Sequence, residues 1–225
     1  MNYATLFQTI QAYCENDFPD TVVSTTSATN TDFLTKSQID TFIQQAEQRV
    51  FNSVQIPDLR KNVTGNCTSG NKYLSVPSDW LANFSLARID ADGTQEFLLN
   101  KDVEFIRSCY PSPSDTGPPR YYAIFDQNSY ILGPTPDASY SMELHYFYYP
   151  QSIVVAGTSW LGDKFDSVLL YGSLLEAYTF MKGEQDVQTT YLARYGEALA
   201  MLKQLGEGKN RQDMYRTQQA RYPVK

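Results

Sequence analysis

Ser141-Met142-Glu143-Leu144-His145-Tyr146-Phe147-Tyr148-Tyr149 sets the structural character of the middle of this chain. Apolar side chains recur at every second position of this stretch, at Met142, Leu144, Tyr146 and Tyr148, and Glu143, His145, Phe147 and Tyr149 alternate with them. Successive side chains of a β-strand point to opposite faces of a sheet. The alternation therefore predicts a half-buried antiparallel strand.

The same character extends outward from this stretch, over residues 60–150. Short runs rich in Tyr, Val, Ile and Leu are separated there by turn residues, which is typical of strands. We expect strands at residues 72–76, 85–89 and 96–99, a hairpin over 120–132, a helical turn at 101–109 and a hairpin tip at 65–70.

Four segments outside this region have apolar residues three or four positions apart, which predicts amphipathic helices. They cover residues 4–15, 36–54, 163–182 and 186–205. Residues 16–34 are rich in Asp, Pro, Ser, Thr and Asn. That composition predicts a loop.

Individual residues at the helix ends and interiors refine this prediction. Thr35 and Gln38 have the spacing of a capping box before the second helix, and Asp163 is placed to cap the third. Gly172 is expected to permit close approach of another helix to the third. Gly206 is expected to end the fourth helix.

The predicted fold class is α+β, with an antiparallel four-helix bundle and a strand-rich antiparallel β insertion between helices 2 and 3. An extended C-terminal tail completes the prediction. We expect four segments: N-terminal helices at 1–59, the β-rich insertion at 60–158, a C-terminal helix pair at 159–206 and a basic tail at 207–225.

Charge is distributed unevenly along the 225 residues, whose formal net charge is −7. Residues 207–225 hold five basic and two acidic side chains, a net charge of +3, which leaves −10 on the rest of the chain. An acidic body with a basic tail indicates two surfaces with different partners. An acidic body also argues against tight wrapping of DNA, because Lys and Arg provide affinity for phosphates.

The sequence offers no coherent catalytic or metal-binding set. His145 is the only histidine, and Cys14, Cys67 and Cys109 are far apart and form no CxxC pair. Neither a zinc site nor a histidine-based nucleophile is expected from this inventory. The phosphate-binding glycine motifs are absent as well. We therefore assign no catalytic, cofactor-binding or metal-binding residue and expect a protein without enzymatic activity.

The sequence predicts no membrane-spanning or secretory segment. No run approaches the roughly 18 apolar residues of a membrane-spanning helix, and the first residues lack the pattern of a signal peptide, so we expect a soluble intracellular protein.

The chain is rich in aromatic residues, with 17 Tyr, 12 Phe and 2 Trp. Tyrosine suits both half-buried sheets and protein interfaces, and composition alone leaves both readings open.

Several short segments together resemble the adaptor, or head-to-tail connector, family of short-tailed phages. They occur in order over about residues 36–215. The segments are Ile56-Pro57-Asp58-Leu59-Arg60, Tyr73-Leu74-Ser75-Val76-Pro77-Ser78-Asp79-Trp80-Leu81, Glu96-Phe97-Leu98-Leu99-Asn100-Lys101-Asp102, Pro119-Arg120-Tyr121-Tyr122-Ala123, Ile131-Leu132-Gly133-Pro134-Thr135-Pro136, Tyr148-Tyr149-Pro150, Ser159-Trp160-Leu161-Gly162 and Glu176-Ala177-Tyr178.

The resemblance implies a structural subunit of the virion neck, assembled in the host cytoplasm and without cofactors. It implies a ring, commonly of twelve copies, between the portal protein and the tail nozzle protein, with DNA passing through the lumen without specific binding. It also implies that the C-terminal segment reaches into the portal.

These implications, read with the residue types, predict two sets of contact residues. Arginine and tyrosine are enriched at interface hot spots, so the portal-binding set lies in the basic tail. Its members are Lys209, Arg211, Tyr215, Arg216, Arg221 and Tyr222. The second set is predicted to contact the nozzle or a neighbouring subunit, and comprises Tyr121, Tyr122, Tyr146 and Tyr148.

A second function remains open at this point. A Tyr-rich β module of a phage tail or fibre could recognise a host surface or carbohydrate. Helices at both ends of the chain and the basic tail favour the adaptor, and no internal repeat of the fibre type is visible.

Overall fold

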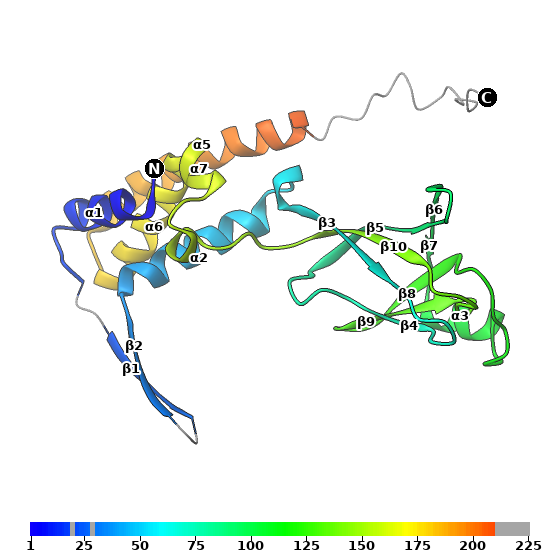
Figure 1. Cartoon of the computed structure of the whole chain (residues 1–225). Coiled ribbons are helices and arrows are strands. Elements are labelled where there is room, and N and C mark those ends of the chain that lie inside the picture. Colours follow the sequence, from blue (N-terminus) through cyan, green and yellow to red (C-terminus); the bar gives the residue numbers. More distant parts are fainter. Residues whose placement is uncertain (19–20, 28–29, 210–225) are drawn as a thin grey trace. The chain divides into compact units, whose positions relative to one another are not determined.

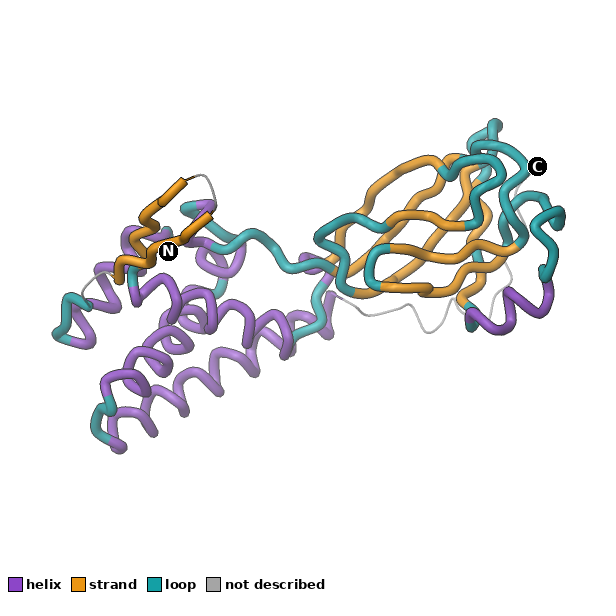
Figure 2. Tube along the Cα trace, turned by 90° about the horizontal axis from the view of Figure 1, so that it is seen from below, coloured by secondary structure: helices purple, strands orange, loops and turns teal. Residues whose placement is uncertain are grey.

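The computed structural model describes residues 1–18, 21–27 and 30–209 (Figure 1). The chain divides into two compact units. The helical unit contains the residues up to Pro57 together with those from Pro150 onward, and the second unit runs from Asp58 to Tyr149. Figure 2 shows the helices in purple and the strands in orange.

The helical unit is built around one central helix. Its helices are α1 (Tyr3–Cys14), α2 (Gln38–Ser53), α4 (Ile153–Ala156), α5 (Trp160–Lys164), α6 (Asp166–Met181) and α7 (Gln185–Lys209). Helix α6 contacts α1, α2, α5 and α7, and its apolar residues are therefore buried on most sides rather than along one stripe. A Cβ on Gly172 would lie 3.1 Å from the Cβ of Ala46 on α2. This glycine thus permits the close helix approach expected of it.

The predicted loop at 16–34 is wrong for most of its length. Strands β1 (Thr21–Ser27) and β2 (Asn30–Lys36) form an antiparallel hairpin with seven paired positions, from Thr21 with Lys36 to Ser27 with Asn30. The composition of this segment predicts a loop because Ser, Thr, Asn and Asp favour turns. Its β-branched Val and Thr residues also favour strands, and here that preference prevails.

The second unit is a sandwich of two four-stranded sheets. The first sheet has the antiparallel order β3 (Arg60–Asn66), β10 (Ser141–Phe147), β5 (Ala82–Ile89), β6 (Gln95–Phe97). The other has the order β4 (Tyr73–Ser75), β9 (Ser129–Gly133), β8 (Tyr121–Asp126), β7 (Leu99–Asn100), with β7 and β8 parallel. The short helix η1 (Pro57–Leu59) precedes β3.

The core of the sandwich lies between the two sheets. It joins side chains from both sheets and from the connecting segments: Cys67, Leu86, Leu98, Tyr122, Tyr130, Leu132, Met142, Leu144 and Tyr146. The alternation predicted for residues 141–149 is confirmed from Ser141 to Phe147, because Met142, Leu144 and Tyr146 are buried and the residues between them are not. Tyr148 lies beyond the end of the strand and is half-buried. Helix α3 (Val103–Cys109) packs through Ile106 on the opposite face of the second sheet, against Ala123 and Ile131.

The structure corrects the predicted architecture. The chain is α+β, but the four-helix bundle with a single β insertion is wrong, since the described residues form seven α-helices, a separate hairpin and two four-stranded sheets. The predicted strand at 96–99 is in fact β6 and β7, which belong to different sheets. The predicted helix at 163–182 is two helices that meet at Phe165, and Asp163 lies inside the first of them.

Helix ends also differ from prediction. Ser37, rather than Thr35, precedes α2, and its side chain makes no capping hydrogen bond. Helix α7 continues through Gly206 to Lys209. A Cβ at residue 206 would stand 2.6 Å from Ile56 Cγ2, so this glycine serves close packing inside the helix. The predicted extended tail beyond Lys209 lies outside the described residues.

Candidate interaction surfaces

The outer face of the β3-β10-β5-β6 sheet carries exposed phenylalanine rings. Phe84 is 50% exposed and Phe97 63% exposed, and Phe147 is half-buried. The Phe84 ring lies 4.8 Å from the His145 ring and 6.1 Å from the Phe147 ring, centroid to centroid. The Arg60 guanidinium lies 4.2 Å from the Phe84 ring centroid. We call Arg60, Phe84, Phe97, His145 and Phe147 the Phe84 patch.

A β-bulge in β5 produces this arrangement. His145 of β10 pairs with Ser85, and the next residue, Tyr146, pairs with Asn83, so Phe84 has no partner residue in the ladder. Bulges of this kind re-aim side chains. Here the bulge places the Phe84 ring beside His145 and Phe147 on the outer face.

Polar side chains hold the outer face together around the rings. The Glu143 carboxylate on β10 accepts hydrogen bonds from the side-chain amides of Asn62 on β3 and Gln95 on β6, the latter at 2.6 Å. Aromatic and arginine side chains are enriched at interface hot spots, and exposed apolar patches mark interaction sites. The Phe84 patch is therefore a candidate contact surface.

The four tyrosines predicted to contact a nozzle or a neighbour are not equivalent. Tyr122 and Tyr146 lie in the sandwich core, 4% and 1% exposed. Tyr121 is half-buried and its ring packs 5.4 Å from that of Phe105 on α3. Tyr148 is half-buried, with the Lys61 ammonium 5.5 Å from its ring centroid. Tyr121 and Tyr148 retain exposed surface, whereas Tyr122 and Tyr146 are packing residues.

A hydrogen-bonded network joins Tyr146 to the edge of the sandwich. Its hydroxyl donates to Asp79 Oδ1 at 2.8 Å, and Lys61 Nζ donates to Asp79 Oδ2 at 2.7 Å. The hydrogen bond from Lys61 lowers the pKa of Asp79, and the bond to Asp79 raises the pKa of Lys61. Burial, followed by the hydrogen bond to Asp79, raises the pKa of Tyr146. The network fastens β3 and β10 to the turn before Trp80.

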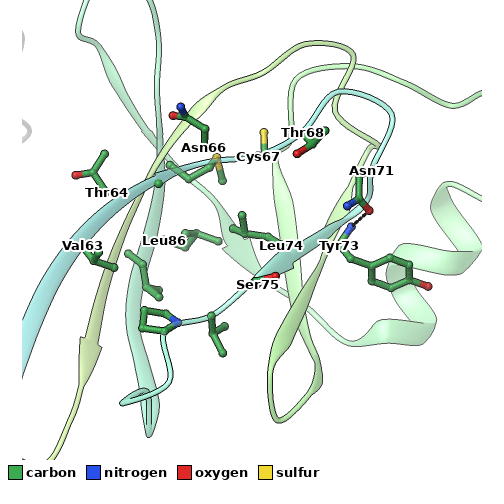
Figure 3. A pocket seen from close by; sticks show the side chains of 15 residues that line it. Val63, Thr64, Asn66, Cys67, Thr68, Asn71, Tyr73, Leu74, Ser75 and Leu86 are labelled. Atoms are coloured by element: carbon green, nitrogen blue, oxygen red, sulfur yellow. Dashed lines mark hydrogen bonds between the residues drawn. The ribbon is translucent and has the colours of Figure 1, made fainter.

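A groove opens between the edge strands β3 and β4 of the two sheets (Figure 3). Its cavity measures about 330 Å³. Figure 3 shows Leu74 and Leu86 in the space between the strands. The apolar lining comes from both sheets and includes Val63, Leu74, Val76, Leu86, Met142 and Leu144. The groove has an apolar floor, and a strand edge forms each of its sides.

The helical unit exposes apolar side chains on its last two helices. Leu192, Met201 and Leu205 of α7 and Phe180 of α6 are exposed. The buried face of α7 carries Tyr195 and Leu202.

The predicted portal-binding set falls at the end of the described chain. Lys209 is the last residue of α7. Arg211, Tyr215, Arg216, Arg221 and Tyr222 lie outside the described residues. They stay a prediction.

Metal-ligating side chains are not clustered in the part of the chain that the structure describes. Over residues 1–18, 21–27 and 30–209, no three His, Cys, Asp or Glu side chains are grouped so as to hold a metal ion. His145 packs edge-on against Phe84. Among the described helices, none combines the length and the apolar character that crossing a membrane requires.

Sequence reasoning missed the Phe84 patch and the groove. The alternation in residues 141–149 places Phe147 on the face opposite the buried residues, so it predicts one of the outward-facing rings of the patch. The position of Phe84 depends on the bulge, and the groove depends on which strands form the sheet edges. Neither property follows from periodicity.

The chain matches the model of the SU10 adaptor protein family over residues 1–222. No curated protein matches it. The match spans the helical unit and the sandwich, so the relationship covers both units rather than one.

Proposed function

The chain belongs to the SU10 adaptor protein family, as its resemblance to phage adaptors indicated, and we propose that it forms the ring that joins the portal to the tail nozzle in a phage neck. The family match over residues 1–222 carries this proposal. The role is structural, and we assign it no reaction and no cofactor. The proposed ring contains twelve copies and assembles in the host cytoplasm.

The charge of the chain supports a ring through which DNA passes. Residues 1–206 carry a net charge of −10. Such a surface repels phosphates and does not retain them. A lumen lined by this body lets DNA pass without specific binding.

The basic tail is the proposed portal contact. Residues 207–225 have a net charge of +3 and interleave Tyr215 and Tyr222 with three arginines. A positively charged segment steers association with an acidic surface, and its aromatic and arginine side chains supply hot-spot contacts. We propose that Lys209, Arg211, Tyr215, Arg216, Arg221 and Tyr222 bind the portal.

The sandwich supplies the proposed contact with the nozzle. Tyr121 and Tyr148 retain exposed surface, and the Phe84 patch presents exposed rings beside Arg60. We propose that these side chains meet the nozzle protein, because aromatic rings and arginine dominate the energetic centre of protein interfaces.

The test is a pull-down of the full chain with the portal protein of the same genome, imaged by negative-stain electron microscopy. A ring stacked on the portal is expected. A chain that ends at Lys209 should keep its thermal stability and lose attachment, because the deletion removes tail residues only. A second variant, with Arg211, Arg216 and Arg221 changed to Gln, separates the contribution of charge from that of the two tyrosines.

Two outcomes contradict the proposal. Full attachment of the chain that ends at Lys209 would remove the tail from the portal contact. A stable trimer in solution that does not bind the portal would favour the alternative function, a binding module of a phage tail or fibre.

A further inference from the structure

Among the residues that the structure describes, the sandwich has one long strand edge without a neighbour. Strand β3 has seven residues and pairs there only with β10. The other three edge strands, β4, β6 and β7, have three, three and two residues. Native proteins usually shorten, charge or cover such edges, because an open edge is a template for another strand.

The ladder shows which backbone groups of β3 face outward. The Cys67 N–H donates to the Tyr140 carbonyl at 3.0 Å, and the Tyr148 N–H donates to the Leu59 carbonyl at 3.0 Å. Hydrogen-bonded pairs alternate along an antiparallel ladder, so the odd-numbered residues of β3 bond to β10. The N–H and C=O groups of Asn62, Thr64 and Asn66 therefore point to the open edge.

The groove beside this edge can hold the side chains of an added strand. It is the cavity of about 330 Å³ between β3 and β4, and Val63 on its rim is 37% exposed. Gly65 pairs with the buried Met142 and lines the groove. A Cβ at Gly65 would meet no atom within 4 Å, so the absence of a side chain there is part of what keeps the groove open.

The hairpin β1–β2 lacks a partner of its own. It is a two-stranded sheet, and among the described residues no third strand joins it. A two-stranded hairpin is marginally stable at best in water, and a third strand is needed for independent stability. Strands β1 and β3 both have seven residues. Five residues of β1 are β-branched and none is charged, which suits a strand beside an apolar groove.

We propose that strand β1 of one copy of the chain adds to the open edge of β3 in the next copy and covers the groove. Main-chain hydrogen bonds supply affinity in this mode of recognition, and alternate side chains enter the pockets. The hairpin and the β3 edge are different surfaces, so the contact is head-to-tail. Such contacts repeat from copy to copy and close into rings when the rotation permits. The inference thus rests on the proposed ring and assigns its subunit contact.

Disulfide trapping between two tagged populations of the full chain tests the contact. Cys14 and Cys109 are first replaced by Ser, and Cys67 stays because it is buried. One population carries Thr64→Cys, and the other carries Ser24→Cys or, for the adjacent register, Thr25→Cys. Paired strands bring cross-strand positions within reach of a disulfide. A two-tag product is expected after mild oxidation at high protein concentration.

Two further substitutions in the Thr64→Cys population should each reduce the yield of the two-tag product at least tenfold. Gly65→Leu fills the groove, and it should leave thermal unfolding unchanged or raise its midpoint, since the added Cβ meets no atom. Asn62→Pro removes an outward N–H without removing a bond to β10. The position control is a population that carries its cysteine on the exposed surface of α3, as Glu104→Cys, and keeps Thr64.

Three results would overturn the contact. The first is a two-tag yield no higher than that of the Glu104→Cys control. The second is a yield that both blocking variants leave unchanged. The third is an internal disulfide, without two-tag product, in a chain that carries both cysteines, which would show that the chain covers its own groove. Portal rings without a two-tag product would reject this contact and leave the adaptor role, whereas a two-tag product without portal attachment would reject the adaptor role alone.

Discussion

Glu47 on α2 is a carboxylate inside the helical unit, only 2% exposed. Its Oε1 accepts a hydrogen bond of 2.9 Å from the backbone N–H of Ile153, the first residue of α4. Burial raises the pKa of Glu47, and hydrogen bonds from Ser152 and Ile153 oppose that rise. The side chain therefore ties the chain returning from the sandwich to α2, and its charge is unfavourable in that position.

Changing Glu47 to Gln should make the helical unit less sensitive to pH. The pKa of Glu47 is higher in the folded chain than in the unfolded chain, so the folded state favours the protonated form. Its contribution to stability is complete below the unfolded pKa and is lost as the pH rises through the folded pKa. Glu47→Gln keeps the acceptor for Ile153 without the charge. The variant and the parent should have equal free energies of unfolding at low pH, and the variant should be more stable at neutral pH.

Urea unfolding across pH 3–8 measures this difference, and Glu47→Ala serves as the contrasting variant. Alanine leaves the Ile153 N–H without its acceptor, which costs about 1–3 kcal/mol at every pH. A parent chain that stays more stable than Glu47→Gln at neutral pH would contradict the argument, because it would show that the ionised carboxylate stabilises the fold.

Elements with a strong period were predictable, and elements that depend on distant partners were not. The alternation in 141–149 predicted β10 because its apolar side chains must face a core. The hairpin β1–β2 has little apolar periodicity, so its composition predicts a loop. The division of residues 96–99 between two sheets depends on β5 and β8, which lie elsewhere in the sequence. Register and sheet membership are properties of pairs of strands.

The candidate site residues follow the same rule. Tyr122 and Tyr146 have the residue type of an interface, but the alternation of faces along their strands places both side chains in the core. That alternation alone predicts that Tyr146 and Phe147 face opposite sides of the sheet. The exposure of Phe84 needed the bulge opposite His145 and Tyr146, which the sequence of β5 does not encode by itself.

Helix α7 illustrates how context changes the meaning of a glycine. Gly196 and Gly206 both lie in this helix. A Cβ on Gly196 would meet no atom within 4 Å, whereas a Cβ on Gly206 would stand 2.6 Å from Ile56 Cγ2 and 3.3 Å from the Gln55 carbonyl oxygen. The first glycine lowers helix stability without a packing role, and the second allows the helix to approach the segment after α2.

The two glycines should therefore respond in opposite ways to alanine. Gly196→Ala should raise the free energy of unfolding by up to about 1 kcal/mol, because alanine restricts the unfolded chain and favours helix. Gly206→Ala should lower it by about 1–3 kcal/mol through overpacking against Ile56. Denaturant unfolding followed by far-ultraviolet circular dichroism measures both. Equal stabilisation by the two substitutions would show that Gly206 has no packing role.

At the scale of the whole molecule, the sandwich is an insertion whose two ends meet. The Tyr148 N–H donates to the Leu59 carbonyl at 3.0 Å, so the chain enters the unit beside the point where it leaves. The residues of the sandwich core all belong to the segment from Asp58 to Tyr149. A unit with adjacent ends and its own core meets the requirements for folding alone.

Each unit also contains one of the two tryptophans. In the sandwich, the Trp80 indole N–H donates to Asn83 Oδ1 at 2.8 Å, and the Trp80 ring packs edge-on against Tyr130. In the helical unit, Trp160 packs against Phe51 and Phe165. Tryptophan fluorescence therefore reports the sandwich in a Trp160→Phe chain and the helical unit in a Trp80→Phe chain.

A fragment of residues 58–149 should fold cooperatively, and its Trp80 fluorescence should change at the same urea midpoint as in the Trp160→Phe full chain. The reason is that strands β3 and β10, which carry the two ends, are paired along their whole length, so cutting the chain at 58 and 149 removes no ladder bond. In the full chain, the Trp80 and Trp160 signals should then follow separate transitions, because each core can be lost without the other. A fragment without a cooperative transition, or coincident transitions in the full chain, would show instead that the sandwich draws its stability from the helical unit.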